Sequence, residues 1–287
     1  MASNTRSEEQ FAVITDSTAD IAPAIAREHG IEVVPLAVTI GGETIADGVL
    51  TQEEFFRRMQ AESALPTTSQ PSAGAFEDVY GRALERASSV ISVHISDKLS
   101  GTIGSARVAA EGFAGKVHVF DSRNLSWGLT WQVLDAAAAA REGLGVPEAL
   151  ERLARARERV RLIVGLDSLE NLRRGGRIGA VSSLMGSLLN LKVTLTVDEE
   201  GVFAPLGRSR GEKAGLEFTL DWISKQMGTA RKGRFAVGHA LSAERADRLA
   251  ESIRQRWEAT ELVIYEAGSA ICTHTGTGWG VAFLPER

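Results

Sequence analysis

Short apolar runs alternate with longer stretches of helical spacing over roughly the first 160 residues. Phe11–Thr15 and Ser89–Ile95 are apolar-rich runs of the kind found in buried strands. Between such runs, apolar residues recur every three or four positions, which predicts amphipathic helices. We expect strands at 11–15, 31–40, 89–95 and 116–120, a loop at 66–72, and helices at 20–29, 51–62, 74–87, from about 100, at 125–142 and at 147–160. This order predicts a mainly parallel, Rossmann-like α/β sheet with helices on its faces.

The pattern changes near Arg161. The segment 198–201 predicts a hairpin turn between two strands, so the second part of the chain should contain a mixed sheet. We expect strands at 161–166, 191–197, 202–206, 234–239 and 262–265, and helices at 211–227 and 243–257. The chain therefore divides into two expected α/β domains, residues 11–160 and 161–287. Because no low-complexity linker joins them, the two should pack tightly.

Composition narrows the classes of partner. The chain has 287 residues and a formal net charge of −5, so no basic field would draw it to nucleic acid. No apolar run approaches the roughly 18 residues of a membrane span. The first ten residues are polar, lack the apolar core of a secretory signal, and are expected to form a short mobile tail. We expect a cytoplasmic protein that binds no nucleic acid and has at most transient membrane contact.

Metal and nucleotide chemistry have little support in the sequence. The chain has no Gly-x-Ser-x-Gly motif and no phosphate-binding loop of the Gly-x-x-x-x-Gly-Lys-Ser/Thr kind. Its five histidines show no metal-ligand spacing, and the single cysteine, Cys272, cannot build a thiolate zinc site. We expect no metal and no cofactor.

Hydroxyl-rich loops follow several of the expected strands. Ligands bind at the carboxyl ends of strands in open parallel sheets, although such residues also cap helices. Ser96 and Ser100 follow one strand, and Gly101 would let a ligand approach a helix N-terminus. Thr67 and Thr68 add neutral donors. Donors of this kind suit one carboxylate beside an apolar cavity.

A second group of candidates is basic. Arg173, Arg174 and Arg177 surround two glycines in a turn that could hold a phosphate or an acidic partner, or could simply be solvated. Arg208 lies beyond the hairpin. Taken alone, it is expected to be a solvent-exposed side chain with no binding role. His274 is flanked by hydroxyl residues and glycines, which makes it a ligand-site candidate.

Taken together, these segments resemble the DegV family, whose members serve as fatty-acid-binding subunits of bacterial fatty acid kinase. The likeness runs from Phe11 to about Phe283. Its marks, in chain order, are Thr15-Asp16-Ser17-Thr18, Pro66-Thr67-Thr68-Ser69-Gln70-Pro71, Ile95-Ser96 with Leu99-Ser100-Gly101-Thr102, Phe120-Asp121-Ser122, Asn171-Leu172-Arg173-Arg174-Gly175-Gly176-Arg177-Ile178, and Thr273-His274 with Gly276 and Gly278.

The resemblance implies two α/β domains with a long-chain fatty acid buried between them. It implies that Thr67, Thr68 and Ser96 bind the carboxylate, and that His274 and Arg208 help present it to a kinase. The kinase subunit would phosphorylate the carboxylate from ATP to give an acyl phosphate for phospholipid synthesis. This chain would then be a non-catalytic lipid carrier. The sequence departs from the family pattern at Asp97, where a second serine often follows the first.

The residues are also compatible with two other functions. A serine-dependent acyl hydrolase would need Ser96 or Ser100 within reach of His274, and a carboxylate to orient the histidine. A lipid-sensing regulatory module is the other alternative, although no DNA-binding motif supports direct contact with DNA.

Overall fold

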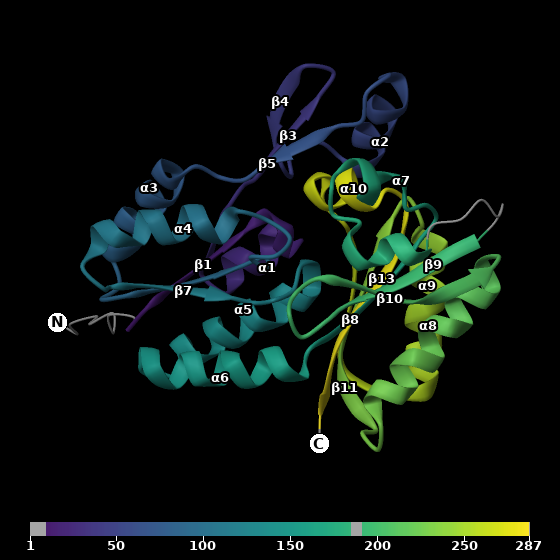
Figure 1. Ribbon diagram of the computed structural model, residues 1–287. Coiled ribbons are helices and arrows are strands. Elements are labelled where there is room, and N and C mark those ends of the chain that lie inside the picture. The colour runs from purple at the N-terminus through teal and green to yellow at the C-terminus, as the bar shows by residue number, and fades with distance from the viewer. Residues whose placement is uncertain (1–9, 185–190, 287) are drawn as a thin grey trace.

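Two separate central sheets organise the chain (Figure 1). The computed structural model describes residues 10–184 and 191–286. The first sheet has four parallel strands in the order β2-β1-β6-β7. These strands are β1 (Ala12–Asp16), β2 (Ile31–Val34), β6 (Val90–His94) and β7 (Val117–Asp121). The expected parallel sheet is confirmed.

Helices cover both faces of this sheet. Val13 of β1 belongs to a core that contains the two tryptophans of α5, whereas its neighbour Ile14 packs with Phe76 and Tyr80 of α3. Successive side chains of a strand point to opposite faces, so a buried strand between two helix layers is apolar throughout. The helices around this sheet are α1 (Pro23–Glu28), α3 (Ala73–Leu84), α4 (Thr102–Ala110), α5 (Ser126–Arg141) and α6 (Val146–Arg159).

The second sheet has six strands in the order β10-β9-β8-β13-β11-β12. Only the β11–β12 pair is parallel, which confirms the mixed sheet. The strands are β8 (Arg161–Leu166), β9 (Leu191–Val197), β10 (Phe203–Arg210), β11 (Lys232–Ala240), β12 (Glu258–Glu266) and β13 (Gly278–Glu286). Helices α8 (Glu212–Met227) and α9 (Ala243–Arg256) pack on one face. The division of the chain at residue 161 remains our prediction.

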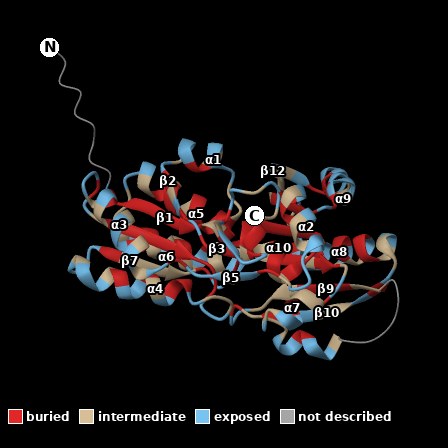
Figure 2. Cartoon of the chain, turned by 90° about the horizontal axis from the view of Figure 1, so that it is seen from above, coloured by how far each residue is buried: buried red, intermediate tan, exposed pale blue. Residues whose placement is uncertain are grey.

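Helix α5 lies between the two sheets. Its residues share one core with β1 and β6 of the first sheet and with β8 and β13 of the second. The indole of Trp131 on α5 donates to the Ala282 carbonyl of β13. A helix with apolar residues all round is expected to be buried on all sides, and Figure 2 shows the buried residues concentrated between the exposed outer helices.

A third sheet was not expected from the sequence. It is antiparallel, in the order β4-β3-β5, and comprises β3 (Ala37–Ile40), β4 (Glu43–Ala46) and β5 (Thr67–Ser69). The expected strand 31–40 was wrong as a single element, because Pro35 lacks an N–H and the chain leaves the first sheet there. The expected loop 66–72 instead supplies an edge strand, because β3 offers it backbone partners.

The third sheet connects distant parts of the chain. Its apolar face and helix α2 (Gln52–Ala61) pack against Ala270 and Cys272 of the short helix α10 (Ser269–Thr275). The remaining short elements are the 3-10 helices at 17–19, 111–113 and 179–184, and α7 (Glu170–Arg174). The polar tail expected at residues 1–10 lies almost wholly outside the described residues.

Candidate functional site

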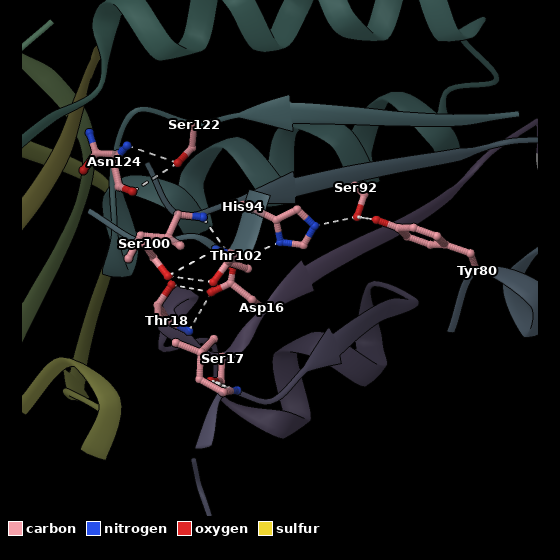
Figure 3. A network of polar contacts seen from close by, with 12 residues as sticks. Asp16, Ser17, Thr18, Tyr80, Ser92, His94, Ser100, Thr102, Ser122 and Asn124 are labelled. Carbon is pink, nitrogen blue, oxygen red and sulfur yellow. Dashed lines mark hydrogen bonds and ion pairs between the residues drawn. The ribbon is translucent and has the colours of Figure 1, made fainter. Parts of the chain in front are cut away.

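Hydroxyl side chains gather where β1, β6 and β7 end (Figure 3). The Asp16 carboxylate lies at their centre and is fully buried. One of its oxygens accepts the Thr18 backbone N–H at 3.0 Å, and the other accepts the Ile95 N–H at 3.1 Å. Asp16 thus fixes the backbone immediately before Ser96.

The same carboxylate ends a buried polar chain. Tyr80 donates to Ser92 at 2.9 Å, Ser92 lies 2.6 Å from Nε2 of His94, and Nδ1 of His94 lies 2.9 Å from Asp16. A Ser-His-Asp array of this kind resembles that of a hydrolase. All four side chains are 0% exposed, however, so a substrate cannot reach the serine. We assign the array to the stability of the sheet.

Thr68 meets His274 although 206 positions separate them in the chain. The Thr68 hydroxyl lies 2.7 Å from Nε2 of His274. Thr68 stands on β5 and His274 on α10, so the third sheet and its packing against α10 bring them together. Thr67 points to the opposite face of β5 and is exposed. The structure therefore brings Thr68 to His274 and does not bring Thr67 there.

His274 is a neutral side chain at physiological pH. Burial, reinforced by the nearby Arg177 guanidinium, lowers its pKa from 6.5 to about 4. Its Nδ1 is buried without a hydrogen-bond partner and lies beside the backbone of Gly175. Since a buried orphan N–H is rarer than an under-satisfied acceptor, the proton belongs on Nε2. The histidine then donates to Thr68 and leaves the threonine proton free for another acceptor.

Ser96 is buried at the start of the loop after β6. Its hydroxyl donates to the Gly201 carbonyl at 2.7 Å and accepts the Lys98 backbone N–H at 3.2 Å. Ser100, further along, lies 2.8 Å from the Thr102 hydroxyl. Neither serine has a hydrogen bond to His274 among the described residues. The contacts therefore do not assemble the serine–histidine pair that a hydrolase would require.

Asp97, which lines the hollow beside this loop, pairs with an arginine of α4. Its carboxylate lies 3.5 Å from the Arg107 guanidinium, and its side chain is 42% exposed. Both the opposite charge and the solvent screen its field. The departure from the family pattern therefore adds little negative charge at Ser96.

A polar hollow opens beside this loop, which we call the vestibule. Its volume is about 470 Å³, and Asp97–Gly101 form one wall. Arg177 also lines the vestibule and donates to the Leu99 carbonyl at 3.3 Å. Val202 and Phe203, at the base of the β9–β10 hairpin, complete it. Ser100, Gly101 and Arg177 thus line one hollow, and Arg177 is half-buried rather than on the outer surface.

An apolar slot lies behind Phe203, which lines both spaces. Leu162, Val164 and Leu166 of β8 form its floor, and Ile271 of α10 lies at its side. Three lining positions on β11 and β13 are glycines, at 238, 278 and 280. Neighbouring groups fill the space beside two of them, because an added Cβ would stand 2.4 Å from the Tyr265 ring at Gly238 and 2.2 Å from the Gly165 carbonyl oxygen at Gly278. The volume is only about 40 Å³, below the roughly 300–1,000 Å³ typical of ligand pockets. A long ligand would have to spread the walls.

Polar groups mark one margin of the slot. Ser126 and Tyr265 both line it, and their hydroxyls lie 2.7 Å apart. Ser126 also donates to Asp20 at 2.5 Å, and Asp20 accepts the Gly268 N–H at the start of α10. Burial raises the pKa of Asp20 from 3.8 to about 8, so this carboxyl is mostly protonated at neutral pH. A second carboxylate, Asp47, accepts the Ala270 N–H, and burial raises its pKa as well.

The other arginines lie outside the vestibule. Arg173 and Arg174 are exposed and both pair with Glu170. Arg208 is exposed and donates to the Ser183 carbonyl of the 3-10 helix at 179–184. The sequence therefore grouped four arginines that the structure separates into one at the vestibule and three at the surface.

Two features of the site were not found from the sequence. Gly201 approaches Ser96 from the hairpin turn at a distance that only a glycine allows, with φ +83°. The Asn171 amide donates to the Thr273 carbonyl at 3.1 Å and holds the chain next to His274. Asn171 stood within a motif noted for its arginines, and Gly201 within a predicted turn, but their long-range contacts have no local sequence pattern.

No group of three or more histidine, cysteine, aspartate or glutamate side chains is arranged to hold a metal ion within 10–184 and 191–286. Over the same ranges, no helix combines the length and apolar character needed to cross a bilayer.

The fold and the site together define a class: an α/β protein with a parallel and a mixed sheet, a partly polar vestibule lined by Ser100 and Arg177, and an apolar slot beside it. Thr68, Ser96 and His274 are not among the residues that line the vestibule. Residues 10–286 match the model of the DegV family, described as a family of uncharacterised proteins. The chain belongs to the DegV family.

Relatives and solved structures agree with this assignment. A DegV domain-containing protein of Deinococcus radiodurans is 37% identical over 96% of this chain and 98% of its own length. A fatty-acid-binding DegV family protein from Thermus thermophilus superposes with a TM-score of 0.93 at 35% identity, covering 96% of this chain and all of that one. The fatty-acid-binding protein DegV of Bacillus subtilis gives a TM-score of 0.87 at 29% identity, covering 97% of this chain and 100% of that one.

Proposed function

We propose that this protein binds one long-chain fatty acid, with the carboxylate in the vestibule and the acyl chain in the apolar slot. The observation that carries the proposal is the junction at Phe203, where a polar hollow adjoins an apolar one. An amphiphile with one polar end matches that arrangement. The fatty-acid-binding proteins of Thermus thermophilus and Bacillus subtilis, similar over nearly their whole length, support it.

The head-group contacts follow from hydrogen-bond donors. With the proton of His274 on Nε2, the Thr68 hydroxyl can donate to a carboxylate. Ser96 and Ser100 add hydroxyls, and Gly101 precedes the N-terminus of α4, which favours negative charge. Arg177, another lining residue, supplies a positive charge. Thr67, being exposed on the other face of β5, would contribute indirectly by holding the strand.

The acyl chain supplies most of the affinity in this proposal. Burying about fourteen methylenes at ~0.8 kcal/mol each gives roughly 11 kcal/mol before entropy and desolvation are subtracted. The slot lies between the mixed sheet and α5, so the tail would be buried between the two expected domains. Widening the slot would reduce the net gain.

We further propose that the carrier itself performs no catalysis and delivers its cargo to a kinase. A fatty acid kinase subunit would transfer the γ-phosphoryl group of ATP to the bound carboxylate, releasing ADP and forming an acyl phosphate for phospholipid synthesis. The exposed Arg208, Arg173 and Arg174 would face this partner. Because Glu170 already pairs with the last two, Arg208 is the strongest contact candidate among them.

Mass spectrometry of lipid extracted from the purified protein tests the binding proposal. We expect one long-chain fatty acid per chain, displaceable by added palmitate. Protein that carries no lipid and takes up no palmitate during titration would contradict the proposal. Adding a fatty acid kinase and ATP to loaded protein then tests the delivery step separately, through the appearance of an acyl phosphate.

A further inference from the structure

The Ser96 hydroxyl is already occupied by a bond to the β9–β10 hairpin. It donates its single proton to the Gly201 carbonyl and accepts from the Lys98 backbone. Ser96 is 0% exposed, because the turn at 198–202 covers it. A carboxylate has no proton to offer at neutral pH and must accept one. Ser96 therefore cannot serve Gly201 and a fatty acid at the same time.

The covering turn is internally rigid. The Asp198 carboxylate accepts the N–H groups of Glu200 and Val202, and the Asp198 carbonyl accepts the Gly201 N–H. Such a turn keeps its shape when it moves, because these bonds travel with it. If the turn moves, the backbone angles should change at the adjoining ends of β9 and β10 and not within the turn.

Few polar contacts hold this turn to the first sheet's loops. Besides the Ser96 bond, the exposed Arg123 donates to the Glu199 carbonyl at 3.0 Å. Gly201 lies so close that an added Cβ would stand 2.3 Å from the Ser96 hydroxyl and 3.1 Å from the Arg123 Cα. The turn therefore packs closely over Ser96. Among the described residues, only two hydrogen bonds attach it to the loops of the first sheet.

We infer that the 198–202 turn is a gate. The fatty-acid carboxylate opens it by replacing the Gly201 carbonyl as the acceptor of the hydrogen bond that Ser96 donates. This inference rests on the proposed function and concerns its regulation. Val202 and Phe203, at the base of the same hairpin, line the vestibule, and Phe203 also lines the slot. Lifting the turn therefore exposes Ser96 and moves the residues at the junction of the two spaces. A loaded protein would present a displaced hairpin to its partner, and an unloaded one would not.

The rate of fatty-acid uptake tests this gate. If only the open molecules bind the ligand, the apparent Kd is the intrinsic Kd divided by the fraction of molecules that are open. A larger open fraction therefore gives tighter apparent binding. Arg123→Ala removes one fastening without touching the vestibule, so cis-parinaric acid should associate at least about threefold faster and bind correspondingly more tightly. Gly201→Ala should act in the same direction, since its methyl group pushes the turn off Ser96. Arg152→Ala removes a half-buried arginine of α6 that pairs with Glu142 and makes no hydrogen bond to the turn. This variant is the matched control and should leave the rate unchanged.

Stopped-flow fluorescence gives the rates, and circular dichroism checks that each variant is folded. Unchanged or slower association in a folded Arg123→Ala protein, with weaker or equal affinity, would overturn the gate. The proposed function fails differently, because wild-type protein would then take up no cis-parinaric acid at all.

Discussion

The pairing of Thr68 with His274 shows how two ordinary residues become a site. Neither is charged at neutral pH, since burial lowers the pKa of His274 to about 4. Their 2.7 Å contact occupies the threonine oxygen and leaves the hydroxyl proton free for another acceptor. A neutral donor of this kind recognises a carboxylate without burying a counter-charge that would require a large desolvation energy.

Thr68→Val tests this donor because it keeps the shape and removes the hydroxyl. We expect the binding free energy for palmitate to weaken by about 1 kcal/mol, or roughly fivefold in Kd. Thr67→Val is the matched control on the exposed face of β5 and should bind as the wild type does. Isothermal titration calorimetry provides both values. Equal losses in the two variants would mean that the strand, and not the Thr68 hydroxyl, is responsible.

Asp97 offers a second residue-scale test. Its carboxylate pairs with Arg107 and is partly exposed, so it should not interact strongly with a bound carboxylate. We expect Asp97→Ser to bind palmitate with the wild-type Kd at both pH 5.5 and pH 8. Tighter binding by the variant at pH 8 alone would place Asp97 beside the head group after all.

At the scale of elements, the sequence predicted those whose pattern is local. The bounds predicted for the buried strands β1 and β6 each differ from the observed bounds by one residue. A continuous apolar run can be recognised without knowledge of a distant partner. The strand β13 was not found, since Gly278, Gly280 and Pro285 obscure its pattern. It forms because β8 and β11 pair with it on both sides.

The helix α10 depends on two carboxyl groups from the other end of the chain. Asp20 and Asp47 accept the N–H groups of Gly268 and Ala270. Burial raises the pKa of Asp20 to about 8, so folded protein holds a proton that unfolded protein releases above about pH 4. The contribution of Asp20 to folding stability therefore falls as the pH rises from about 4 to about 8.

Asp20→Asn removes this titration, and its amide oxygen can still accept the Gly268 N–H while its NH2 group can donate to the Ser126 hydroxyl. We expect the free energy of unfolding to decline less between pH 5 and pH 8 in the variant than in the wild type. A residual decline should persist, since burial also raises the pKa of Asp47. Urea unfolding followed by circular dichroism measures both curves. Parallel curves would show that Asp20 is not the titrating group.

At the scale of the whole molecule, the site is assembled by contacts that sequence patterns do not contain. The hydroxyl loops and His274 were recognised as candidates from their composition and from the family resemblance. Their geometry was not predictable, because Thr68–His274 and Ser96–Gly201 join residues 206 and 105 positions apart. The third sheet and the hairpin bring these pairs together, and the first of these elements was missed.

The surface beyond the vestibule should matter to the partner and not to the lipid. Arg208 is exposed and bonded to the Ser183 carbonyl, outside both spaces. We expect Arg208→Ala to bind palmitate with the wild-type Kd and to slow acyl-phosphate formation by a fatty acid kinase severalfold. Arg155→Ala, another exposed arginine, should change neither. Loss of palmitate affinity in Arg208→Ala would instead assign this arginine to the carboxylate.

We propose that one fatty acid binds with its carboxylate at the vestibule and its tail in the slot. The most direct measurement is a crystal structure with a fatty acid that carries bromine on its last carbon, located by anomalous scattering. We predict the carboxylate within about 3.2 Å of the Thr68 and Ser96 hydroxyls and the bromine beyond Phe203, among the apolar side chains of β8. Bromine in the vestibule, or a chain bound elsewhere on the molecule, would contradict it.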